Sequence, residues 1–340
     1  MKSEFAFINQ IRAQAARRSA DLVCGIGDDT AITSEQMGRE TLITADLLIE
    51  DVHFRLDYTS LHCLGHKALA VSLSDIAAMG GQPRFALLTL GIPKNNLSAA
   101  IRNPQWDEFF AGYFALAEKF GVTLIGGDTS ASPQSLVIDS IVMGSCESGK
   151  AVRRHGARVG DAIYVTGNLG ASAAGLELLR RGECLNDNIH DLVQTALRTH
   201  LQPQPRIEFG QLVGAAGLAH AMMDVSDGLA QDLSHICEES GVGAIIDDET
   251  MPVAPETKLV AENDEAAFRL AVSGGEDYEL LLTASREYEP ALLEIARTCH
   301  LRLSRIGEVV APDPSGTSPL WLRRGHRIEA LDTSGYDHFA

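Results

Sequence analysis

One repeated feature constrains this sequence more than any other: an aspartate that directly follows an apolar segment and stands beside small residues. Its central copy is Ser-Leu-Ser-Asp-Ile-Ala-Ala-Met-Gly-Gly (72–81), where Leu73 and Ile76 flank Asp75. A carboxylate in such apolar surroundings is costly to bury unless it is paired with a cation or coordinates a metal. For Asp75 taken alone, the simpler interpretation is the N-cap of a helix.

Four other segments repeat this pattern. They are Gly-Ile-Gly-Asp-Asp (25–29), Leu-Ile-Thr-Ala-Asp (42–46), Leu-Ile-Gly-Gly-Asp-Thr (124–129) and Met-Asp-Val-Ser-Asp-Gly (223–228). Each of them alone is ordinary turn chemistry, because Gly-Asp and Asp-Gly are common in turns. Five together indicate oxygen-rich sites at strand ends, which hard cations such as Mg2+ prefer. We therefore predict a site that holds several magnesium ions.

The composition narrows the class of protein. With 340 residues, 45% hydrophobic and 22% charged, the chain is globular and long enough for two domains. Its net charge of −18 argues against a nucleic-acid or anionic-membrane surface, so a phosphate ligand would need metal ions to reverse the local sign. Six cysteines without a Cys-x-x-Cys pair, no apolar signal core and no long apolar run predict a cytoplasmic protein.

The order of apolar patterns predicts two domains. Residues 1–148 read as a mixed α/β domain and residues 149–340 as an α+β domain, so the fold class is α+β with two domains. Expected helices in the first domain are 3–18, 61–79 and 104–120, and expected strands are 41–49, 84–92, 122–125 and 135–143. In the second domain the expected strands are 162–166, 243–247, 278–283 and 303–309, and the expected helices are 171–181, 206–220, 229–240, 259–271 and 287–299. Residues 183–205 read as a loop with a short helix, and the chain ends in a tail that carries Trp321.

Two glycine-containing segments imitate phosphate-binding loops. Gly144 to Ala151 nearly matches G-x-x-x-x-G-K-[ST], but Ala151 lacks the hydroxyl that would meet a magnesium ion. Gly167 to Gly175 follows a strand and opens a helix, yet its glycine spacing differs from G-x-G-x-x-G. We interpret the second as close helix–strand packing, so a bound nucleotide must be held mainly through metals.

The motifs taken in order carry a resemblance to a known family. The first half holds Gly-Ile-Gly-Asp-Asp (25–29), Asp46 followed by His53-Phe54, Ser-Leu-Ser-Asp-Ile-Ala-Ala-Met-Gly (72–80) and Ile-Gly-Gly-Asp-Thr (125–129). The second half holds Asp-Val-Ser-Asp-Gly-Leu (224–229), Ser-Gly-Gly-Glu-Asp-Tyr-Glu-Leu (273–280) and Gly-Tyr-Asp-His-Phe (335–339). Together they resemble the thiamine-monophosphate kinase family, in the superfamily that also contains aminoimidazole ribonucleotide synthetase, selenophosphate synthetase and a hydrogenase-maturation protein.

The resemblance implies ATP-dependent phosphorylation of thiamine monophosphate to thiamine diphosphate, by a homodimer whose first domains pair their sheets into a barrel. The implied magnesium ligands are Asp29, Thr44, the main chain of Ala45, Asp46, Asp75, Asp128, Asp224 and Asp227. The implied ATP contacts are Gly127, Asp128, Arg154 and Ser226, and the implied thiamine phosphate contacts are His53 and Glu276.

Three positions depart from the family pattern. Thr333 stands where an aromatic residue suited to stacking on the thiamine ring is usual, so Trp321 or Tyr336 would have to take that part. Phe110 stands where a tyrosine is common near the adenine. Asp51 replaces a usual glycine just before Val52 and His53.

The chemistry of the acceptor agrees with this assignment. A phosphate-monoester oxygen is already anionic, so no protein residue is needed as a general base. The task is to bring two polyanions together, which several magnesium ions and Arg154 could do by neutralising charge. We therefore expect direct in-line transfer without a phosphoenzyme.

Three alternative functions fit the sequence less well. A selenophosphate synthetase would need a reactive cysteine in a mobile glycine-rich loop, and Cys24 lies at an expected strand entry instead. A hydrogenase-maturation protein would end in a cysteine motif, whereas this chain ends in His338-Phe339-Ala340. A purely structural magnesium protein would leave His53, Arg154 and Glu276 unexplained.

Overall fold

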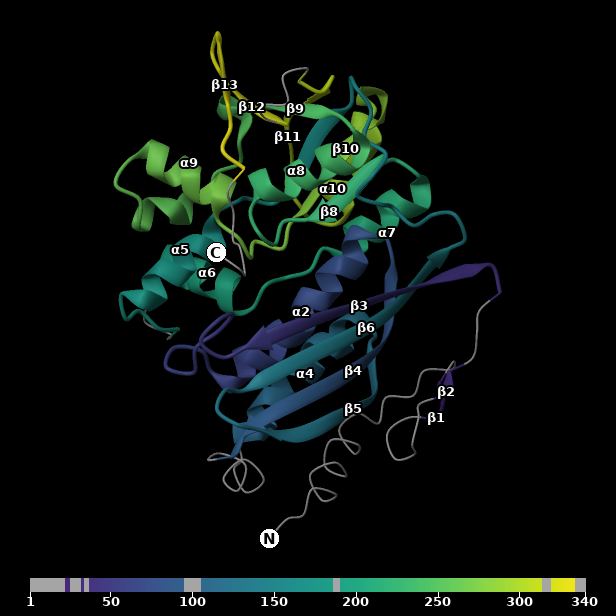
Figure 1. Ribbon diagram of the computed structural model, residues 1–340, viewed down its shortest axis with the longest axis vertical. Coiled ribbons are helices and arrows are strands. Elements are labelled where there is room, and N and C mark those ends of the chain that lie inside the picture. The colour runs from purple at the N-terminus through teal and green to yellow at the C-terminus, as the bar shows by residue number, and fades with distance from the viewer. Residues whose placement is uncertain are drawn as a thin grey trace. The chain divides into compact units, whose positions relative to one another are not determined.

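The structure is a computed structural model that describes residues 22–24, 32–33, 37–94, 105–185, 190–313 and 319–333 (Figure 1). The expected helix 3–18, Asp29 and the Gly-Tyr-Asp-His-Phe ending lie outside these residues. The chain forms two compact units: Met1–Ile76 with Gln82–Gly149, and Ala77–Gly81 with Lys150–Ala340. Among the described residues, no helix is long and apolar enough to cross a membrane.

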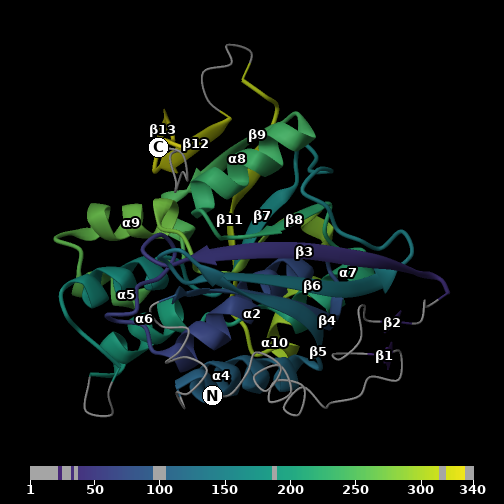
Figure 2. The ribbon, with the colours of Figure 1, turned by 60° about the horizontal axis from the view of Figure 1, so that its bottom comes forward.

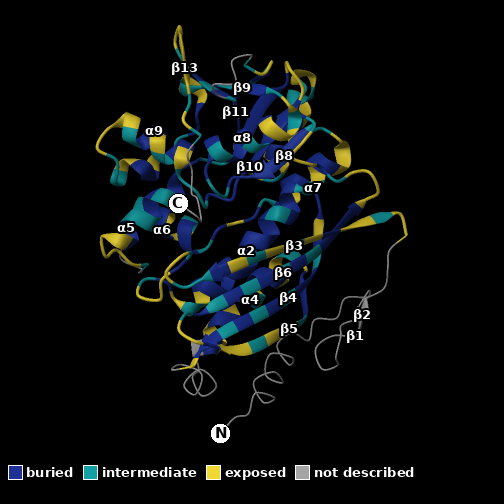
Figure 3. Cartoon of the chain, viewed as in Figure 1, coloured by how far each residue is buried: buried dark blue, intermediate teal, exposed yellow. Residues whose placement is uncertain are grey.

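The first unit is built on a four-stranded sheet in the order β3-β6-β4-β5. Its strands are β3 (Arg39–Ile49), β6 (Val137–Glu147), β4 (Gln82–Pro93) and β5 (Thr123–Ser132), and only β4 and β5 run parallel. Exposed residues alternate with less exposed ones along β3, and half-buried residues alternate with buried ones along most of β6, as Figure 3 shows. The alternation means that one face of this sheet is packed and the other is open. A further short pair, β1 (Leu22–Cys24) and β2 (Ile32–Thr33), is antiparallel.

Helices α2 (Leu61–Ala78) and α4 (Gln105–Phe120) cover the packed face (Figure 2). They cross closely because each has a glycine at the contact: a Cβ on Gly65 would lie 1.9 Å from the Phe109 carbonyl oxygen, and one on Gly112 would lie 2.0 Å from that of His62. Asp75 stands inside α2 rather than at its start, so the N-cap interpretation is wrong.

The second unit holds a seven-stranded sheet in the order β13-β12-β9-β11-β7-β10-β8, in which only the β12–β9 pair is parallel. Its strands are β7 (Ala162–Thr166), β8 (Ala221–Asp224), β9 (Gly243–Asp247), β10 (Leu280–Ala284), β11 (Leu303–Val310), β12 (Leu320–Arg324) and β13 (Arg327–Ala330). Every residue of β7, β10 and β8 is buried, so this end of the sheet is covered on both faces.

The core of the second unit lies between the sheet and α8. It joins Leu233 and Ile236 of α8 to Val165, Met223 and Leu281 of the strands. On the other face the Tyr164 hydroxyl donates a hydrogen bond to Glu289, at the start of α10, over 3.0 Å. The helices of this unit are α5 (Ala171–Arg180), α6 (Asp191–Leu201), α7 (Ile207–Ala216), α8 (Leu229–Ser240), α9 (Asp264–Ser273) and α10 (Glu289–Thr298).

The structure differs from the sequence prediction in four places. Strand β5 continues through Gly126 and Asp128, where we had expected it to stop. The segment 183–205 contains a full helix, α6, and Asp224 ends a strand, β8, that was not predicted. The expected C-terminal tail contains the β12–β13 hairpin. The first half of the imitation phosphate loop, Gly144 to Glu147, lies within β6, which agrees with its dismissal.

Candidate active site

In the second unit, a short segment between β8 and α8 carries two of the expected ligands, Asp224 and Asp227. One carboxylate oxygen, Oδ2 of Asp232, accepts hydrogen bonds from three successive backbone N–H groups of this segment. The donors are Ser226, Asp227 and Gly228, at 3.0, 3.3 and 3.1 Å. The Asp227 side chain is itself held by Gln231, whose Nε2 donates to Asp227 Oδ2 over 3.3 Å.

Asp232 is almost completely buried, with 1% of its surface exposed. Burial, and then the negative charges of Asp224 and Asp227, raise the pKa of Asp232 well above its usual value. The hydrogen bonds from the Gly228 and Ser226 N–H groups lower the pKa of Asp232 but do not outweigh these effects. The carboxyl groups of Asp224, Asp227 and Asp232 therefore lie near one another at one loop. A cation bound there would be stabilised by their negative charge.

A second segment, residues 273–279, is hydrogen-bonded along this loop. The Glu276 N–H donates to the Ser226 carbonyl over 2.7 Å, and the Tyr278 N–H donates to the Val225 carbonyl over 2.9 Å. In return the Val225 N–H donates to the Glu279 carbonyl over 2.8 Å. The segment with the expected substrate contact and the segment with the expected metal ligands therefore form one framework.

Glu276 is fixed from two directions. Its backbone has φ of 65°, in the left-handed region that non-glycine residues rarely adopt. Its carboxylate lies 3.2 Å from Nδ1 of His200, a buried side chain that also lies 3.1 Å from the Ser172 hydroxyl. A strained backbone conformation of this kind persists only where the surrounding structure stabilises it. At Glu276 the surrounding contacts fix the direction of the carboxylate.

The side chain of Asp277 lies against the N-terminus of α5. Its two carboxylate oxygens accept from the backbone N–H groups of Gly170, over 2.7 Å, and Ser172, over 3.1 Å. Burial raises the pKa of Asp277 from 3.8 to about 7, against the lowering effect of these two hydrogen bonds. In the glycine loop at 167–170, the N–H groups of Gly167, Leu169 and Gly170 are thus satisfied by the protein, which agrees with its interpretation as packing rather than a phosphate site.

Glu279 anchors the end of the same segment. Arg206 contacts both of its carboxylate oxygens, with Nε to Oε2 at 2.7 Å and Nη2 to Oε1. The Thr166 hydroxyl donates to Oε2 over 2.6 Å and accepts from the Leu280 N–H over 2.8 Å. A bidentate guanidinium with a third donor compensates the buried charge, so this end is rigid.

In the first unit, three of the expected metal ligands meet on the packed face of the sheet. The Thr44 hydroxyl donates a hydrogen bond to Asp75 Oδ2, from β3 to α2. Burial, and then the charge of Asp75, raise the pKa of Asp46 to about 7. Oδ2 of Asp46 is buried and has no hydrogen-bond partner among the described residues.

These observations fit a magnesium ion. The donors are all oxygen atoms, two carboxylates repel each other, and one buried oxygen is unsatisfied, which a hard cation would correct. Within the described ranges, no group of three or more His, Cys, Asp or Glu side chains closes on one point. Thr44, Asp46 and Asp75 belong to the first unit, Asp224 and Asp227 belong to the second, and Asp29 lies outside the described residues.

Asp128 and Ala45 lie on the other face of the same sheet. Asp128 pairs with Thr89 in register, Thr89 pairs with Asp139, and Asp139 pairs with Leu47. This row is on the open face, so the structure does not bring the Asp128 side chain to Asp46 within the first unit. Gly127, with φ of 150°, lets β5 approach β4 closely, since a Cβ there would lie 1.9 Å from the Leu88 carbonyl oxygen.

His53 folds back on the end of β3. Its Nδ1 accepts a hydrogen bond from the Ile49 N–H over 3.0 Å, which holds the imidazole ring against the end of this strand. Just before it, Asp51 has φ of 67°, a conformation that favours glycine. This explains why a glycine is usual at that position in the family that the sequence resembles.

The remaining expected site residues are spread over both units. Arg154 is exposed, next to Arg153, whose carbonyl accepts from the Met222 N–H over 2.9 Å. Phe110 is buried in α4, with 2% exposed, where its ring packs against Phe109 and Phe114. Thr333 is half-buried at the end of the described chain.

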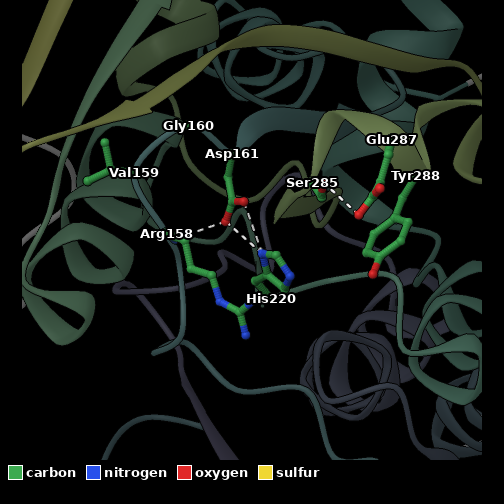
Figure 4. Close-up of a pocket in the computed structure, with 8 residues that line it drawn as sticks. All are labelled: Arg158, Val159, Gly160, Asp161, His220, Ser285, Glu287 and Tyr288. Carbon is green, nitrogen blue, oxygen red and sulfur yellow. Dashed lines mark hydrogen bonds and ion pairs between the residues drawn. The ribbon is translucent and has the colours of Figure 1, made fainter.

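A separate pocket of about 320 Å³ lies in the second unit (Figure 4). Its main contact joins His220 Nδ1 to the Asp161 carboxylate at 2.8 Å, and Asp161 also accepts from the Arg158 N–H. Asp161 precedes β7 and His220 precedes β8, at the end of the sheet opposite Thr166 and Asp224. The pocket is therefore distinct from the framework of Asp224 and Glu276.

Comparison with known proteins identifies the family. The AIR synthase related protein N-terminal domain matches residues 27–146, and its C-terminal domain matches residues 158–317. Thiamine-monophosphate kinase of Bacillus subtilis is 36% identical over 99% of both chains, and that of Escherichia coli is 37% identical over 99% of this chain and 98% of its own. The chain belongs to the thiamine-monophosphate kinase family.

Solved structures of this family agree. Thiamine-monophosphate kinase from Stenotrophomonas maltophilia is 36% identical with a TM-score of 0.82, covering 94% of this chain and 96% of that one. AaThiL complexed with AMPPCP and TMP is 31% identical with a TM-score of 0.75, covering 99% and 97%. The Escherichia coli hydrogenase maturation protein HypE, at 17% identity and a TM-score of 0.75 over 99% of this chain and all of its own, shares the fold alone.

Asp232, His200 and Asp277 make the hydrogen bonds that support the loops with the expected ligands. Asp232 and His200 lie outside the motifs quoted from the sequence, and Asp277 lies inside the motif at 273–280 but was given no role there. A signal existed for Asp232, since an acid in the first turn of a helix is favoured by the helix dipole. His200 had no comparable signal, because its partners Ser172 and Glu276 are far away in sequence.

Proposed function

We propose that this protein transfers the γ-phosphoryl group of ATP to thiamine monophosphate and so forms thiamine diphosphate. The full-length likeness to thiamine-monophosphate kinases supports this, as does a relative, AaThiL, solved with AMPPCP and TMP. The observation that carries it is the framework in which Glu276 is hydrogen-bonded directly to the Asp224–Asp227 loop. Such a framework sets a substrate contact beside carboxylates suited to metal-bound phosphates.

The residue roles follow from the chemistry of each group. Glu276, held by His200, is suited to a cationic part of the substrate, and the imidazole of His53, held by the Ile49 N–H, is the second proposed substrate contact. Arg154 is an exposed guanidinium that can take up charge on the transferring group. The remaining proposed ATP contacts are Gly127, Asp128, Ser226 and Phe110, with Thr333 near the thiamine ring.

Magnesium is the proposed cofactor. The residues that would hold it are Asp29, Thr44, Ala45, Asp46, Asp75, Asp128, Asp224 and Asp227. When bound, it would neutralise the phosphates and favour in-line displacement. The acceptor oxygen is already anionic, so no residue of the chain removes a proton and no phosphoenzyme forms.

The protein is proposed to act as a homodimer. The open face of the first-unit sheet exposes Ile43 to 67% and Leu47 to 49%, and β3 is an edge strand. An apolar sheet face beside an unpaired edge is a surface that a second copy can cover. The cytoplasmic location, and the absence of nucleic-acid and membrane partners, stay predictions from the sequence.

The test is a reaction with ATP, Mg2+ and thiamine monophosphate in which each component is omitted in turn and the product is identified by mass. Thiamine diphosphate formed only with all three supports the proposal. Folded protein that forms none contradicts it. Labelled ATP should leave no phosphate on the protein, and a trapped phosphoprotein would contradict direct transfer.

Asp75→Ala provides the matched test of the metal assignment. Turnover should be abolished while cooperative unfolding is retained, because removing one of two repelling carboxylates need not destabilise the protein. Loss of cooperative unfolding would instead give Asp75 a structural role.

A further inference from the structure

The Asp224–Asp227 loop is held by Asp232, a residue outside the set of expected site residues. Three successive N–H groups, of Ser226, Asp227 and Gly228, all point at Oδ2 of Asp232. Successive N–H groups turned inward form a concavity that binds anions, and in phosphate-binding loops the anion is the ligand. Here the concavity is filled by the protein's own carboxylate, so it is not available to a phosphate of ATP.

The Asp232 carboxylate fixes the backbone of the loop, and with it the positions from which the Asp224 and Asp227 side chains extend. Gly228 has φ of 120°, and a Cβ there would lie 3.0 Å from the backbone of Ser273. The N–H groups of the loop turn toward Asp232, while its carbonyl groups at Val225 and Ser226 accept from Tyr278 and Glu276. Because these backbone N–H and carbonyl groups of the loop are hydrogen-bonded, the backbone that carries Asp224 and Asp227 has a fixed conformation.

We propose that Asp232 is a positioning residue for magnesium binding: it does not touch the metal, and it sets the geometry of Asp224 and Asp227 by accepting three loop N–H groups. This inference rests on the proposed function, in which those two aspartates hold magnesium. Asp232 is 1% exposed, and among the described residues its carboxylate accepts hydrogen bonds from the adjacent loop. This is the environment of a residue that supports a loop rather than one that contacts a ligand. Residues that orient metal ligands typically change metal affinity about 10- to 100-fold when they are mutated.

Two substitutions separate geometry from charge. Asp232→Asn keeps an oxygen acceptor at the same distance from the backbone and removes the charge. Asp232→Glu keeps the charge and moves the carboxylate by one methylene group. If Asp232 acts by geometry, the Asn variant should need within about 3-fold of the wild-type Mg2+ concentration for half-maximal velocity, and the Glu variant about 10-fold more or higher.

A second readout does not depend on turnover. The Mg2+-dependent rise in Tm of each full-length variant measures metal binding by the folded protein, through the linkage of binding to stability. The Asn variant should show a Mg2+ titration midpoint close to that of the wild type, and the Glu variant a midpoint shifted upward by a similar factor. A wild-type protein without kinase turnover would refute the proposed function, while this titration would still test Asp232.

Asp161→Asn is the matched control. Asp161 is a buried aspartate in the same unit that also accepts a backbone N–H, but it lies at the opposite end of the sheet. Its variant should lose stability and keep the wild-type dependence on Mg2+. The proposal is overturned if Asp232→Asn shifts that dependence as far as Asp232→Glu, or if both variants keep it and only lose Tm.

Discussion

Asp51 and Asp277 show how much single residues in this protein depend on their backbone surroundings. Asp51 is exposed, yet its φ of 67° places it where a glycine would be unstrained. Asp277 is an ordinary acid in sequence, yet burial at the N-terminus of α5 raises its pKa to about 7. Each leads to a test in which the sign of the effect, more than its size, is informative.

Replacing Asp51 tests the left-handed backbone at that position. Asp51→Ala should lower the free energy of unfolding by about 1 kcal/mol, because alanine keeps the disfavoured Cβ and lacks the local hydrogen bonding that helps aspartate in the left-handed region. Asp51→Gly should leave stability equal or slightly higher. Urea unfolding of both variants measures the order, and a glycine variant less stable than the alanine variant would contradict the assigned φ.

The buried carboxyl of Asp277 predicts a dependence of stability on pH. Because its pKa is about 7 in the folded protein and 3.8 without the surroundings, its proton is favoured by folding. Its contribution is therefore full below pH 3.8 and is lost as the pH rises to about 7, by a few kcal/mol at most. Asp277→Asn should flatten the curve of unfolding free energy between pH 4 and pH 7.

The level of that curve should also change. An amide turns a donor toward one of the two N–H groups that Asp277 accepts, so the Asn variant should be less stable by about 1–3 kcal/mol where wild-type Asp277 is protonated. Asp264→Asn, at an exposed acid in the first turn of α9, is the control and should leave the slope unchanged. An unchanged slope in the Asp277 variant would refute the raised pKa.

Between elements, the first unit depends on glycines where backbones approach closely. Gly65 and Gly112 allow α2 and α4 to cross, and Gly127 allows β5 to pair with β4 beside a register shift between Ala86 and Leu87. Irregularities of this kind are common next to functional sites, because they redirect a side chain. Here the redirected residue is Asp128, which follows Gly127 directly.

Two neighbouring glycines give a matched pair for this contact. Gly127→Ala should destabilise the protein by about 3 kcal/mol or more, because its Cβ would lie 1.9 Å from the Leu88 carbonyl oxygen and φ is 150°. Gly126→Ala should cost about 1 kcal/mol or less, because its Cβ meets only the end of the Leu87 side chain, at 3.0 Å. Thermal unfolding compares them, and equal losses would refute the close approach.

On the scale of the whole molecule, the open face of the first-unit sheet exposes apolar side chains to water in a single copy of the chain. Its two largest exposed apolar side chains, Ile43 and Leu47, stand on the same face of β3. Water contact with such a face is unfavourable, and pairing with a second copy would remove it. The proposed homodimer therefore has a definite surface to test.

Charging that face should separate the subunits. Ile43→Asp should convert the protein from dimer to monomer in analytical ultracentrifugation, because a carboxylate would be buried without a partner. Ile328→Asp, at an isoleucine 54% exposed on β13 of the second unit, should leave the mass unchanged. A dimeric Ile43 variant, or a monomeric wild type, would refute this interface.

The sequence determined the features that depend on local pattern. Strand β7, helix α8 and strand β9 begin and end where apolar periodicity and the flanking glycines placed them. The ordered aspartate motifs were sufficient for the family, because their residue types and their order are written in the chain. Strand β8 was missed because its four residues are too few for a period to show.

Only the tertiary structure decided how the site is supported. Asp232, 1% exposed, holds the loop that carries two proposed metal ligands. His200 contacts Glu276 and Asp277 accepts from the Gly170 N–H, so the supporting contacts join residues up to 107 positions apart. The structure also placed Asp46 and Asp128 on opposite faces of one sheet, although both follow the same apolar pattern. The physical reason is that side-chain direction and burial depend on pairing register and on packing between distant segments, which no local pattern contains.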